Sequence, residues 1–373
     1  MISRNPLCVV FRTDASIQIG TGHVMRCLTL AEELTHQGHN CHFVCREHPG
    51  HLGDLIASKG HSLKLLPAPK DNLPKPESGA QLHYARWLGV PWQDDARQTL
   101  DALKYLKPDW LVVDHYALDA HWERTLSSAV EQIMVVDDLA NRSHVCTILL
   151  DQNVLYERTR MRYQNLVNED CMLVLGPENA ILRPEYSNFA KVLPERDGVI
   201  ARVLIFVGGS DPYHLTEQYL EALSVPEFHH LYVDVVIGKN HPSPKAVEKL
   251  IAARSKTRLY YELPSLAALM VRSDLMLGAG GSTNWERMCL GLYSIVVSVA
   301  DNQNEINTML ANNEFIHFLG KIDQVSSKVI SDALRGVIRD PLKVKKISNK
   351  SRILVDGEGT KNIVTSILKR SVL

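Results

Sequence analysis

Short runs of valine, isoleucine and leucine alternate along this chain with longer segments that have the apolar spacing of helices. This alternation is typical of βαβ units, in which parallel strands form a sheet and helices cover its faces. A chain of 373 residues exceeds the size at which single cores stop growing, about 250–300 residues. The pattern therefore predicts an α/β protein in which a parallel sheet is built twice.

The expected strands fall into two groups. The first group is Val9–Arg12, His42–Cys45, Leu63–Leu66, Trp110–Asp114, Ile133–Asp137 and Ile148–Leu150. The second group is Val203–Val207, Tyr232–Ile237, Arg258–Tyr261, Leu275–Leu277 and Ile295–Ser298. Between them, Pro184–Val199 combines proline, glycine and charges without a strand pattern, as domain linkers do. We place the boundary there and expect domains at 1–190 and 191–373.

Composition excludes several classes of protein. The 41 basic and 42 acidic side chains nearly cancel, which argues against a nucleic-acid partner. The apolar stretch near the N-terminus is too short for a membrane span and lacks an export signal. Seven scattered cysteines show no metal-ligand spacing and fit a reducing compartment. We expect a cytoplasmic monomer without a membrane segment.

The first strand leads directly into Gly20-Thr21-Gly22-His23 and then into an amphipathic helix. Glycines such as Gly22 let the backbone approach a ligand, and helix-opening amides favour anions. The helix dipole disfavours a charged imidazole in the first turn, so we expect a neutral His23 that can accept a proton. One turn later, Arg26 either meets a phosphate or forms an ordinary salt bridge.

Polar clusters follow several strands of the first half. Parallel strands end at one edge of the sheet, so these clusters are expected to gather there. Each cluster also suits an ordinary helix cap or turn. From this set we expect Asp14 to orient His23 or the substrate. The clusters are Asp14, Asp114-His115-Tyr116, Asp137-Asp138 and Asp151-Gln152-Asn153.

A second glycine loop follows a strand of the second half. Gly280 and Gly281 lead into Ser282 and Thr283, whose amides and hydroxyls suit a diphosphate. Glu286 follows in the first helical turn, where it either accepts from ribose hydroxyls or complements the helix dipole. Two further turns, Val207–Pro212 and Asp301–Gln303, end neighbouring strands; the former is either a phosphate contact or an ordinary βα turn.

With these residues the sequence resembles the UDP-sugar hydrolases of pseudaminic acid synthesis, a pathway for flagellin glycosylation, which act on UDP-2,4-diacetamido-2,4,6-trideoxy-β-L-altropyranose. The matching segments are FRTDASIQIGTGHVMRCLTLA, VVDHYALD, VVDDLANR, LLDQN, LGPENAILRPEY, VLIFVGGSDP and GAGGSTNWERMCLGLYSIVVSVADNQ. The resemblance implies a GT-B-like fold, with two Rossmann-like domains facing one ligand cleft and a last helix that packs back on the first domain.

The resemblance also assigns roles to individual residues. It makes His23 the catalytic base, gives the diphosphate to the loop 280–283 and the ribose to Glu286, and places the uracil at the backbone around Glu262. It puts Asn302 or Gln303 near the reacting water. Two features depart from the family: Tyr293 stands where a small residue or proline is expected, and Pro67–Pro91 is a long excursion near the ligand.

The implied reaction is attack of water on the anomeric carbon, with C–O cleavage, inversion and release of UDP. The partner is a small-molecule UDP-sugar, and we expect neither a cofactor nor a metal site. A glycosyltransferase with the same donor site is the nearest alternative, because only the acceptor side distinguishes the two. A non-catalytic nucleotide-sugar sensor is the second alternative, although such a protein has no use for His23.

Overall fold

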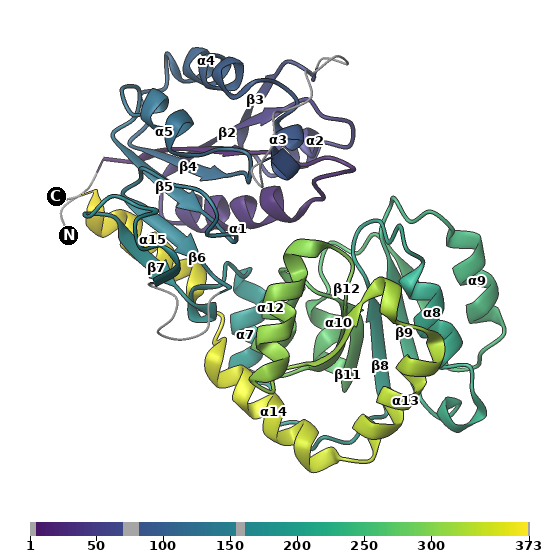
Figure 1. The fold of residues 1–373 in the computed structure, drawn as a ribbon. Coiled ribbons are helices and arrows are strands. Elements are labelled where there is room, and N and C mark those ends of the chain that lie inside the picture. Colours follow the sequence, from purple (N-terminus) through teal and green to yellow (C-terminus); the bar gives the residue numbers. More distant parts are fainter. Residues whose placement is uncertain (1–4, 70–81, 154–160, 372–373) are drawn as a thin grey trace. The chain divides into compact units, whose positions relative to one another are not determined.

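The computed structural model describes residues 5–69, 82–153 and 161–371, and the chain divides into two compact units (Figure 1). The first unit comprises residues 1–181 and 359–373, and the second comprises residues 182–358. Each unit has its own parallel sheet and its own buried core. Both are therefore Rossmann-like.

The first unit contains a seven-stranded sheet in the order β3-β2-β1-β4-β5-β6-β7. Every neighbouring pair is parallel, so the polar residues that end these strands share one edge of the sheet. The strands are β1 (Cys8–Thr13), β2 (Asn40–Arg46), β3 (Ser62–Leu66), β4 (Trp110–Asp114), β5 (Gln132–Val136), β6 (Ile148–Asp151) and β7 (Met172–Leu175).

Helices cover both faces of this first sheet. On one face, Phe11 of β1 and Val112 of β4 pack with apolar residues of α1 and α15. On the other face, Val10 and Leu111 pack with residues of α4 and α5. The helices are α1 (Gly22–His36), α2 (Gly53–Ser58), α3 (Leu82–Leu88), α4 (Trp92–Leu103), α5 (Ala120–Leu126) and α15 (Gly359–Arg370).

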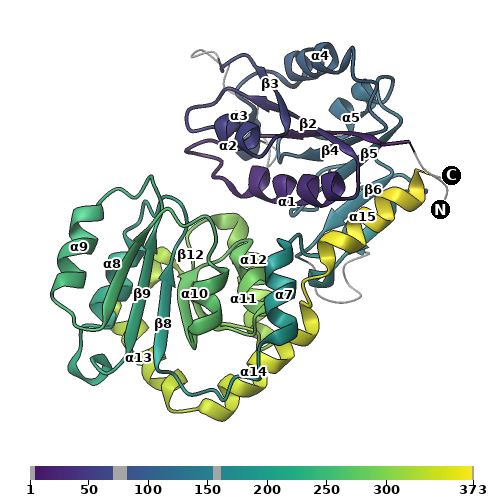
Figure 2. The ribbon, with the colours of Figure 1, turned by 180° about the vertical axis from the view of Figure 1, so that it is seen from behind.

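The second unit contains a six-stranded parallel sheet in the order β10-β9-β8-β11-β12-β13. Its strands are β8 (Arg202–Phe206), β9 (Tyr232–Ile237), β10 (Thr257–Tyr261), β11 (Leu275–Ala279), β12 (Tyr293–Ser298) and β13 (His317–Lys321). Figure 2 shows helices on both sides of it. They are α7 (Pro184–Val192), α8 (Leu215–Ala222), α9 (Pro244–Ala252), α10 (Ala267–Arg272), α11 (Thr283–Cys289), α12 (Asp301–Asn312), α13 (Ser327–Ile338) and α14 (Pro341–Leu354).

Every strand expected from the sequence is present, with bounds that differ by a few residues at most. Two strands were missed, and both are outermost in their sheets. β7 has only four residues, and β13 is partly exposed, contains a glycine and pairs irregularly with β12. Outermost strands pair on one side only, so their sequences carry a weaker apolar signal than central strands do.

The chain enters the second unit at Leu182, earlier than the boundary expected at 190. The segment read as a linker begins instead with α7, which is tied into the second unit by side-chain bonds. Arg183 Nη1 donates to the Pro264 carbonyl (2.7 Å), and Ser265 Oγ donates to Glu185 (2.6 Å). Proline at the first helical position starts a helix as readily as it ends one, which explains the difference.

The excursion Pro67–Pro91 is only partly described, because residues 70–81 lie outside the described ranges. Its first residue and the helix that follows its last residue both bond to the buried Arg46 side chain of the first unit. Arg46 Nη1 donates to the Pro67 carbonyl (2.7 Å), and Arg46 Nη2 pairs with Asp95 of α4 (2.6 Å). Among the described residues, no helix is both long and apolar enough for a membrane span.

Candidate functional site

His23 lies in the first turn of α1 and forms a close pair with Asp114, the last residue of β4. His23 Nδ1 is 2.6 Å from Asp114 Oδ1, and the carboxylate is fully buried. A carboxylate only accepts hydrogen bonds, so Nδ1 carries a hydrogen, and in the neutral ring Nε2 keeps its lone pair. Nε2 has no hydrogen-bond partner among the described residues. The geometry is that of a histidine oriented to act as a base.

The same carboxylate binds Arg26, one turn further along α1. Arg26 donates from Nε to Asp114 Oδ2 (2.5 Å) and from Nη2 to Asp114 Oδ1 (2.6 Å). Burial raises the pKa of Asp114, but Arg26 and His23 oppose that effect and together hold the pKa below its usual range. Asp114 therefore stays ionised and keeps its hold on His23.

Asp138, which follows β5, extends this network. It accepts from Arg26 Nη1 (2.8 Å), from the Tyr116 hydroxyl (2.6 Å) and from Asn153 Nδ2 (2.5 Å). Residues that follow β4, β5 and β6 thus meet at one edge, as expected from the parallel sheet. Arg26 is engaged by two carboxylates, so the salt-bridge alternative describes it, and a phosphate contact would have to displace one of them.

Asp14 is not bonded to His23, whose carboxylate partner is Asp114, and orientation of the substrate by Asp14 stays a prediction. Its Oδ1 accepts from the Arg46 amide (2.6 Å) and pairs with Arg12 Nη1 (2.8 Å), while its Oδ2 lies 3.3 Å from His115 Nε2. All of these groups are buried. Asp14 belongs to a second charged cluster, in which Asp14 and Asp95 together balance the charges of Arg12 and Arg46.

Aromatic rings surround the His23 imidazole. The Tyr116 ring lies edge-on to it at 4.6 Å between centroids, and the Trp87 ring lies at 6.2 Å. Tyr84 contacts both of these aromatic rings. Sequence reasoning missed Tyr84 and Trp87, because they lie on α3 in the proline-rich excursion, where no periodic pattern points to a site.

The second glycine loop lies in the second unit, between β11 and α11. A Cβ atom on Gly280 would lie 2.3 Å from Asn307 Nδ2, and Gly281 has a φ of 103°, so both positions require glycine. Within the described residues, no partner accepts from the amides of Gly281, Ser282 and Thr283. The loop therefore presents donors suited to an anion.

Glu286 is partly buried on α11, beside two residues that were not predicted, Arg183 and Tyr186. Burial raises the pKa of Glu286, and the positive charge of Arg183 opposes that rise. The Arg183 guanidinium lies over the Tyr186 ring, 5.7 Å from its centroid. Both neighbours lie in the LGPENAILRPEY segment, one of the segments that match the family. That match was the signal that could have marked them.

The remaining predicted residues lie near the ends of strands and helices. Gln303 Oε1 accepts from the Val299 amide (3.1 Å), which leaves its amide group beside Gly281. Asn302 is exposed in the first turn of α12. Glu262 follows β10 with a left-handed φ of 47° and donates its amide to Ile237 (3.1 Å). Gly22 opens α1 in open space, so a side chain would fit there.

One group in the second unit has the composition of a metal site: Asp211, Glu217 and His241, all buried. The Ser243 amide donates to His241 Nδ1 (3.2 Å), so the neutral ring carries its hydrogen on Nε2. That nitrogen points between the two carboxylates, at 3.5 and 3.7 Å. A metal ligand needs the lone pair of Nε2, so these contacts favour an ordinary polar cluster.

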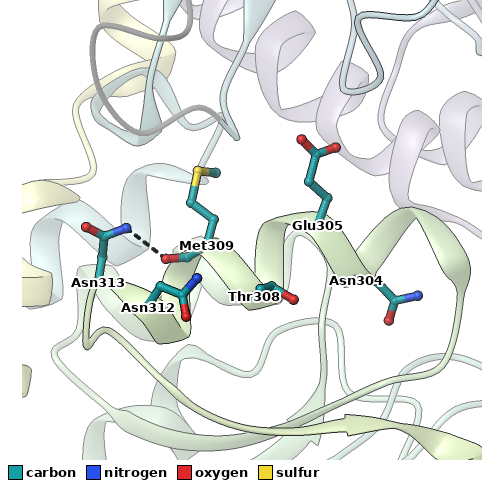
Figure 3. Close-up of a pocket in the computed structure, with 6 residues that line it drawn as sticks. All are labelled: Asn304, Glu305, Thr308, Met309, Asn312 and Asn313. Atoms are coloured by element: carbon teal, nitrogen blue, oxygen red, sulfur yellow. Dashed lines mark hydrogen bonds between the residues drawn. The ribbon is translucent and has the colours of Figure 1, made fainter.

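A hollow of about 380 Å³ lies along α12 (Figure 3). Its lining contains none of the residues predicted from the sequence, and it comes from one helix and the residue that follows. The lining residues are Asn304, Glu305, Thr308, Met309, Asn312 and Asn313. With no convergent set of charged or glycine-loop groups, this hollow carries no argument for a catalytic site.

Comparison with curated sequences gives three similar proteins. The UDP-2,4-diacetamido-2,4,6-trideoxy-beta-L-altropyranose hydrolase of Campylobacter jejuni is 24% identical over 82% of this chain and 97% of its own length. The spore coat polysaccharide biosynthesis protein SpsG of Bacillus subtilis is 24% identical over 79% of this chain and 86% of its own. An uncharacterized protein of Methanocaldococcus jannaschii is also 24% identical over 79% of this chain, which spans only 56% of that protein.

No protein-family model matches the chain. Among solved structures, MurG of Acinetobacter baumannii has a TM-score of 0.64 at 14% identity, covering 98% of this chain and 100% of its own. The calicheamicin glycosyltransferase CalG4 has a TM-score of 0.65 at 13% identity, covering 98% and 99%. The GT-B-like fold and the resemblance expected from the sequence are thus confirmed: this chain is similar to the Campylobacter jejuni UDP-sugar hydrolase over most of the length of both.

Proposed function

We propose that this protein hydrolyses UDP-2,4-diacetamido-2,4,6-trideoxy-β-L-altropyranose to UDP and the free sugar, a step of pseudaminic acid synthesis. The observation that carries the proposal is the buried His23–Asp114 pair at the end of a glycine-containing loop. Its support from relatives is the similarity to the Campylobacter jejuni hydrolase along most of the chain. The first unit supplies the base, and the second unit binds UDP.

The base chemistry follows from the tautomer that Asp114 selects. With the hydrogen on Nδ1, His23 Nε2 takes a proton from water as the water attacks the anomeric carbon. Asp114 then stabilises the imidazolium that forms, because it is already ionised and within hydrogen-bond distance. The C–O bond breaks, UDP leaves as an anion, and the configuration at the anomeric carbon inverts.

The nucleotide chemistry belongs to the second unit in this proposal. The amides of Gly281, Ser282 and Thr283 donate to the diphosphate and stabilise the charge that develops on it. Glu286 accepts from the ribose hydroxyls, and the backbone around Glu262 contacts the uracil. Asn302 or Gln303 holds the attacking water. No metal ion is required by this scheme, since the loop amides supply the positive potential.

Transfer of the sugar to an acceptor hydroxyl is the second candidate function. It is favoured by the likeness to structures of glycosyltransferases such as CalG4, a likeness that by itself concerns the fold alone. In that reaction His23 would deprotonate an acceptor hydroxyl in place of water. The base, its carboxylate and the donor loop would keep the same roles.

A panel of UDP-sugars, incubated with the purified protein with and without sugar or lipid acceptors, tests the proposal. The expected result is UDP release from the diacetamido sugar without any acceptor, at an unchanged rate when acceptors are added. Release that depends on an acceptor would establish the glycosyltransferase. Tight UDP-sugar binding without release under any condition would establish a sensor.

A further inference from the structure

Tyr84, Trp87 and Tyr116 form an aromatic cluster beside the catalytic base. The Trp87 and Tyr116 rings stack at 5.6 Å between centroids, with an angle of 24° between their planes. Tyr84 lies edge-on to Trp87 at 4.8 Å and to Tyr116 at 5.1 Å. Tyr116 in turn lies edge-on to His23 at 4.6 Å. The three rings and the imidazole are therefore one contiguous group.

Packing of the core does not account for this aromatic cluster. Tyr116 is buried and its hydroxyl is fixed by Asp138, but Tyr84 and Trp87 are each only partly buried. The core contact of α3 is made by Leu88, which is 2% exposed. Two large aromatic side chains close to His23 are thus partly accessible, and aromatic side chains beside a polar site are typical of ligand recognition.

The cluster is also held in place from two directions. Asp138 binds the Tyr116 hydroxyl (2.6 Å) as well as Arg26, so the inner ring is tied to the network that orients His23. Arg46 binds the Pro67 carbonyl at the start of the excursion that carries α3, and it also binds Asp95 of α4, the helix that follows the excursion. A fixed ring loses little entropy when a ligand stacks on it.

We infer that Trp87 and Tyr84 bind the apolar side of the sugar ring and make the enzyme selective for 6-deoxy, N-acetylated sugars. The inference rests on the proposed function and deepens it. A 2,4-diacetamido-2,4,6-trideoxy sugar exposes a methyl group at C6 and two acetamido methyl groups. Hexoses carry hydroxyl groups at some of these positions, and burying an unpaired hydroxyl against an aromatic ring is unfavourable.

The test measures binding instead of turnover, by calorimetry in a His23→Asn background that does not consume substrate. The titrants are UDP, UDP-2,4-diacetamido-2,4,6-trideoxy-β-L-altropyranose and UDP-N-acetylglucosamine. Trp87→Ala is expected to lower the affinity for UDP-2,4-diacetamido-2,4,6-trideoxy-β-L-altropyranose, the deoxy sugar nucleotide, by roughly 10- to 100-fold. The affinity for UDP should stay unchanged. Trp87→Phe, which keeps an aromatic face, is expected to retain most of the affinity and covers the case that the alanine variant does not fold.

Trp92→Ala is the matched control, because Trp92 is 36% exposed on α4 and contacts His121, outside the cluster. It should bind all three titrants as the parent does. Equal losses for UDP and the deoxy sugar nucleotide, or no loss in Trp87→Ala, would overturn the inference. So would a parent that binds UDP-N-acetylglucosamine as tightly as the deoxy sugar nucleotide. Failure of the wild-type protein to release UDP would contradict the proposed hydrolysis. The effect of Trp87→Ala on the affinity for the deoxy sugar nucleotide would still decide the inference by itself.

Discussion

At the scale of single residues, one carboxylate organises the proposed catalytic site of the first unit. Asp114 accepts from His23 and from two nitrogens of Arg26, so its four lone-pair positions are largely filled from α1. Because the carboxylate is buried, these bonds operate without competition from water. The orientation and the tautomer of His23 therefore depend on the charge of this one residue.

Replacing Asp114 with asparagine is expected to lower the rate of UDP release by about 10²–10⁴-fold, because the neutral amide no longer selects the Nδ1–H tautomer. The affinity for UDP should stay close to that of the wild type, since the loop proposed to bind the nucleotide belongs to the second unit. Steady-state kinetics together with UDP titration checks both parts. A near-wild-type rate would remove Asp114 from the mechanism.

Asp109→Asn is the control for this substitution. Asp109 precedes the same strand at its opposite end and accepts from the Cys8 amide (2.6 Å). Asparagine keeps an oxygen that accepts from the Cys8 amide, so the replacement removes a carboxylate charge from the same sheet without touching His23. Its rate should stay within a few-fold of the wild type, so a comparable loss in both variants would point to instability instead of catalysis.

The sequence predicted that polar groups would gather at one sheet edge, but it did not predict which carboxylate meets His23. Side chains alternate between the two faces of a strand. Val112 packs on the α1 face, and Asp114, two residues later, points the same way. Asp14 lies two residues after Arg12, which bonds to Asp95 on the opposite face, under α4. The alternation of side chains along β1 and β4, combined with knowledge of which helices cover each face, places Asp114 on the face of α1 and Asp14 on the face of α4.

At the scale of elements, the loop proposed to bind the nucleotide depends on a close contact between the end of β11 and α12. Gly280 faces Asn307, which is buried and bonded to both Asn284 (3.1 Å) and Ser298 (2.9 Å). Asn307 therefore cannot move aside cheaply, and an added methyl group at residue 280 displaces the loop.

Gly280→Ala is accordingly expected to weaken UDP binding by about tenfold or more, as at least one amide-to-phosphate bond is lost. Gly336→Ala on α13 is the control. Residue 336 is exposed, has open space for a Cβ atom and should gain up to about 1 kcal/mol of stability from the better helix former. Calorimetry with UDP compares the two, and equal affinities would remove the loop from the binding site.

The ends of β5 and β6 bring three aspartates together, and the pKa of one of them is raised. Burial, with the negative charge of Asp138 added, raises the pKa of Asp151 to about 8. The Tyr163 hydroxyl lies 2.9 Å from Asp151 and 3.1 Å from Asp137 but has only one hydrogen to donate. When Asp151 carries a proton, its carboxyl group can donate a second hydrogen bond among Tyr163, Asp137 and Asp151.

This protonation makes stability depend on pH in a defined direction. An unfolded aspartate titrates near pH 4, so between about pH 4 and pH 8 the folded state binds more protons than the unfolded state. The contribution of Asp151 to the free energy of unfolding therefore falls as the pH rises through that window.

Asp151→Asn should flatten this dependence, since asparagine keeps a donor for Tyr163 and cannot ionise. Urea unfolding at pH 5, 6.5 and 8 is expected to show that the free energy of unfolding of the variant increases relative to that of the wild type as the pH rises. Asp101→Asn, at an exposed position on α4, should follow the wild-type profile. Parallel profiles for all three proteins would contradict the assignment.

At the scale of the whole molecule, the C-terminal helix completes the core of the first unit. Ile363, Val364 and Ile367 of α15 are fully buried in the cluster that also contains residues of α1. The chain thus leaves the first unit after residue 181 and returns to it at residue 359. No strand or helix pattern reveals such a return, because periodicity reports that a helix buries one face but not which sheet it covers.

Ile367→Ala should therefore destabilise the first unit by about 2–5 kcal/mol, the usual cost of truncating a buried isoleucine. Ile353 on α14 is 85% exposed and offers the matched control, for which a change within about 0.5 kcal/mol is expected. Thermal unfolding of the two variants gives the comparison. Equal unfolding temperatures would mean that α15 does not contribute to the core.

The proposed reaction is tested most directly by the fate of oxygen from water. When UDP-2,4-diacetamido-2,4,6-trideoxy-β-L-altropyranose is hydrolysed in heavy-oxygen water, mass spectrometry of the products identifies the bond that breaks. Attack on the anomeric carbon by water that His23 deprotonates places one labelled oxygen on the free sugar and none on UDP. Label on the phosphate of UDP would mean attack at phosphorus and would contradict the proposed roles of His23 and Asp114.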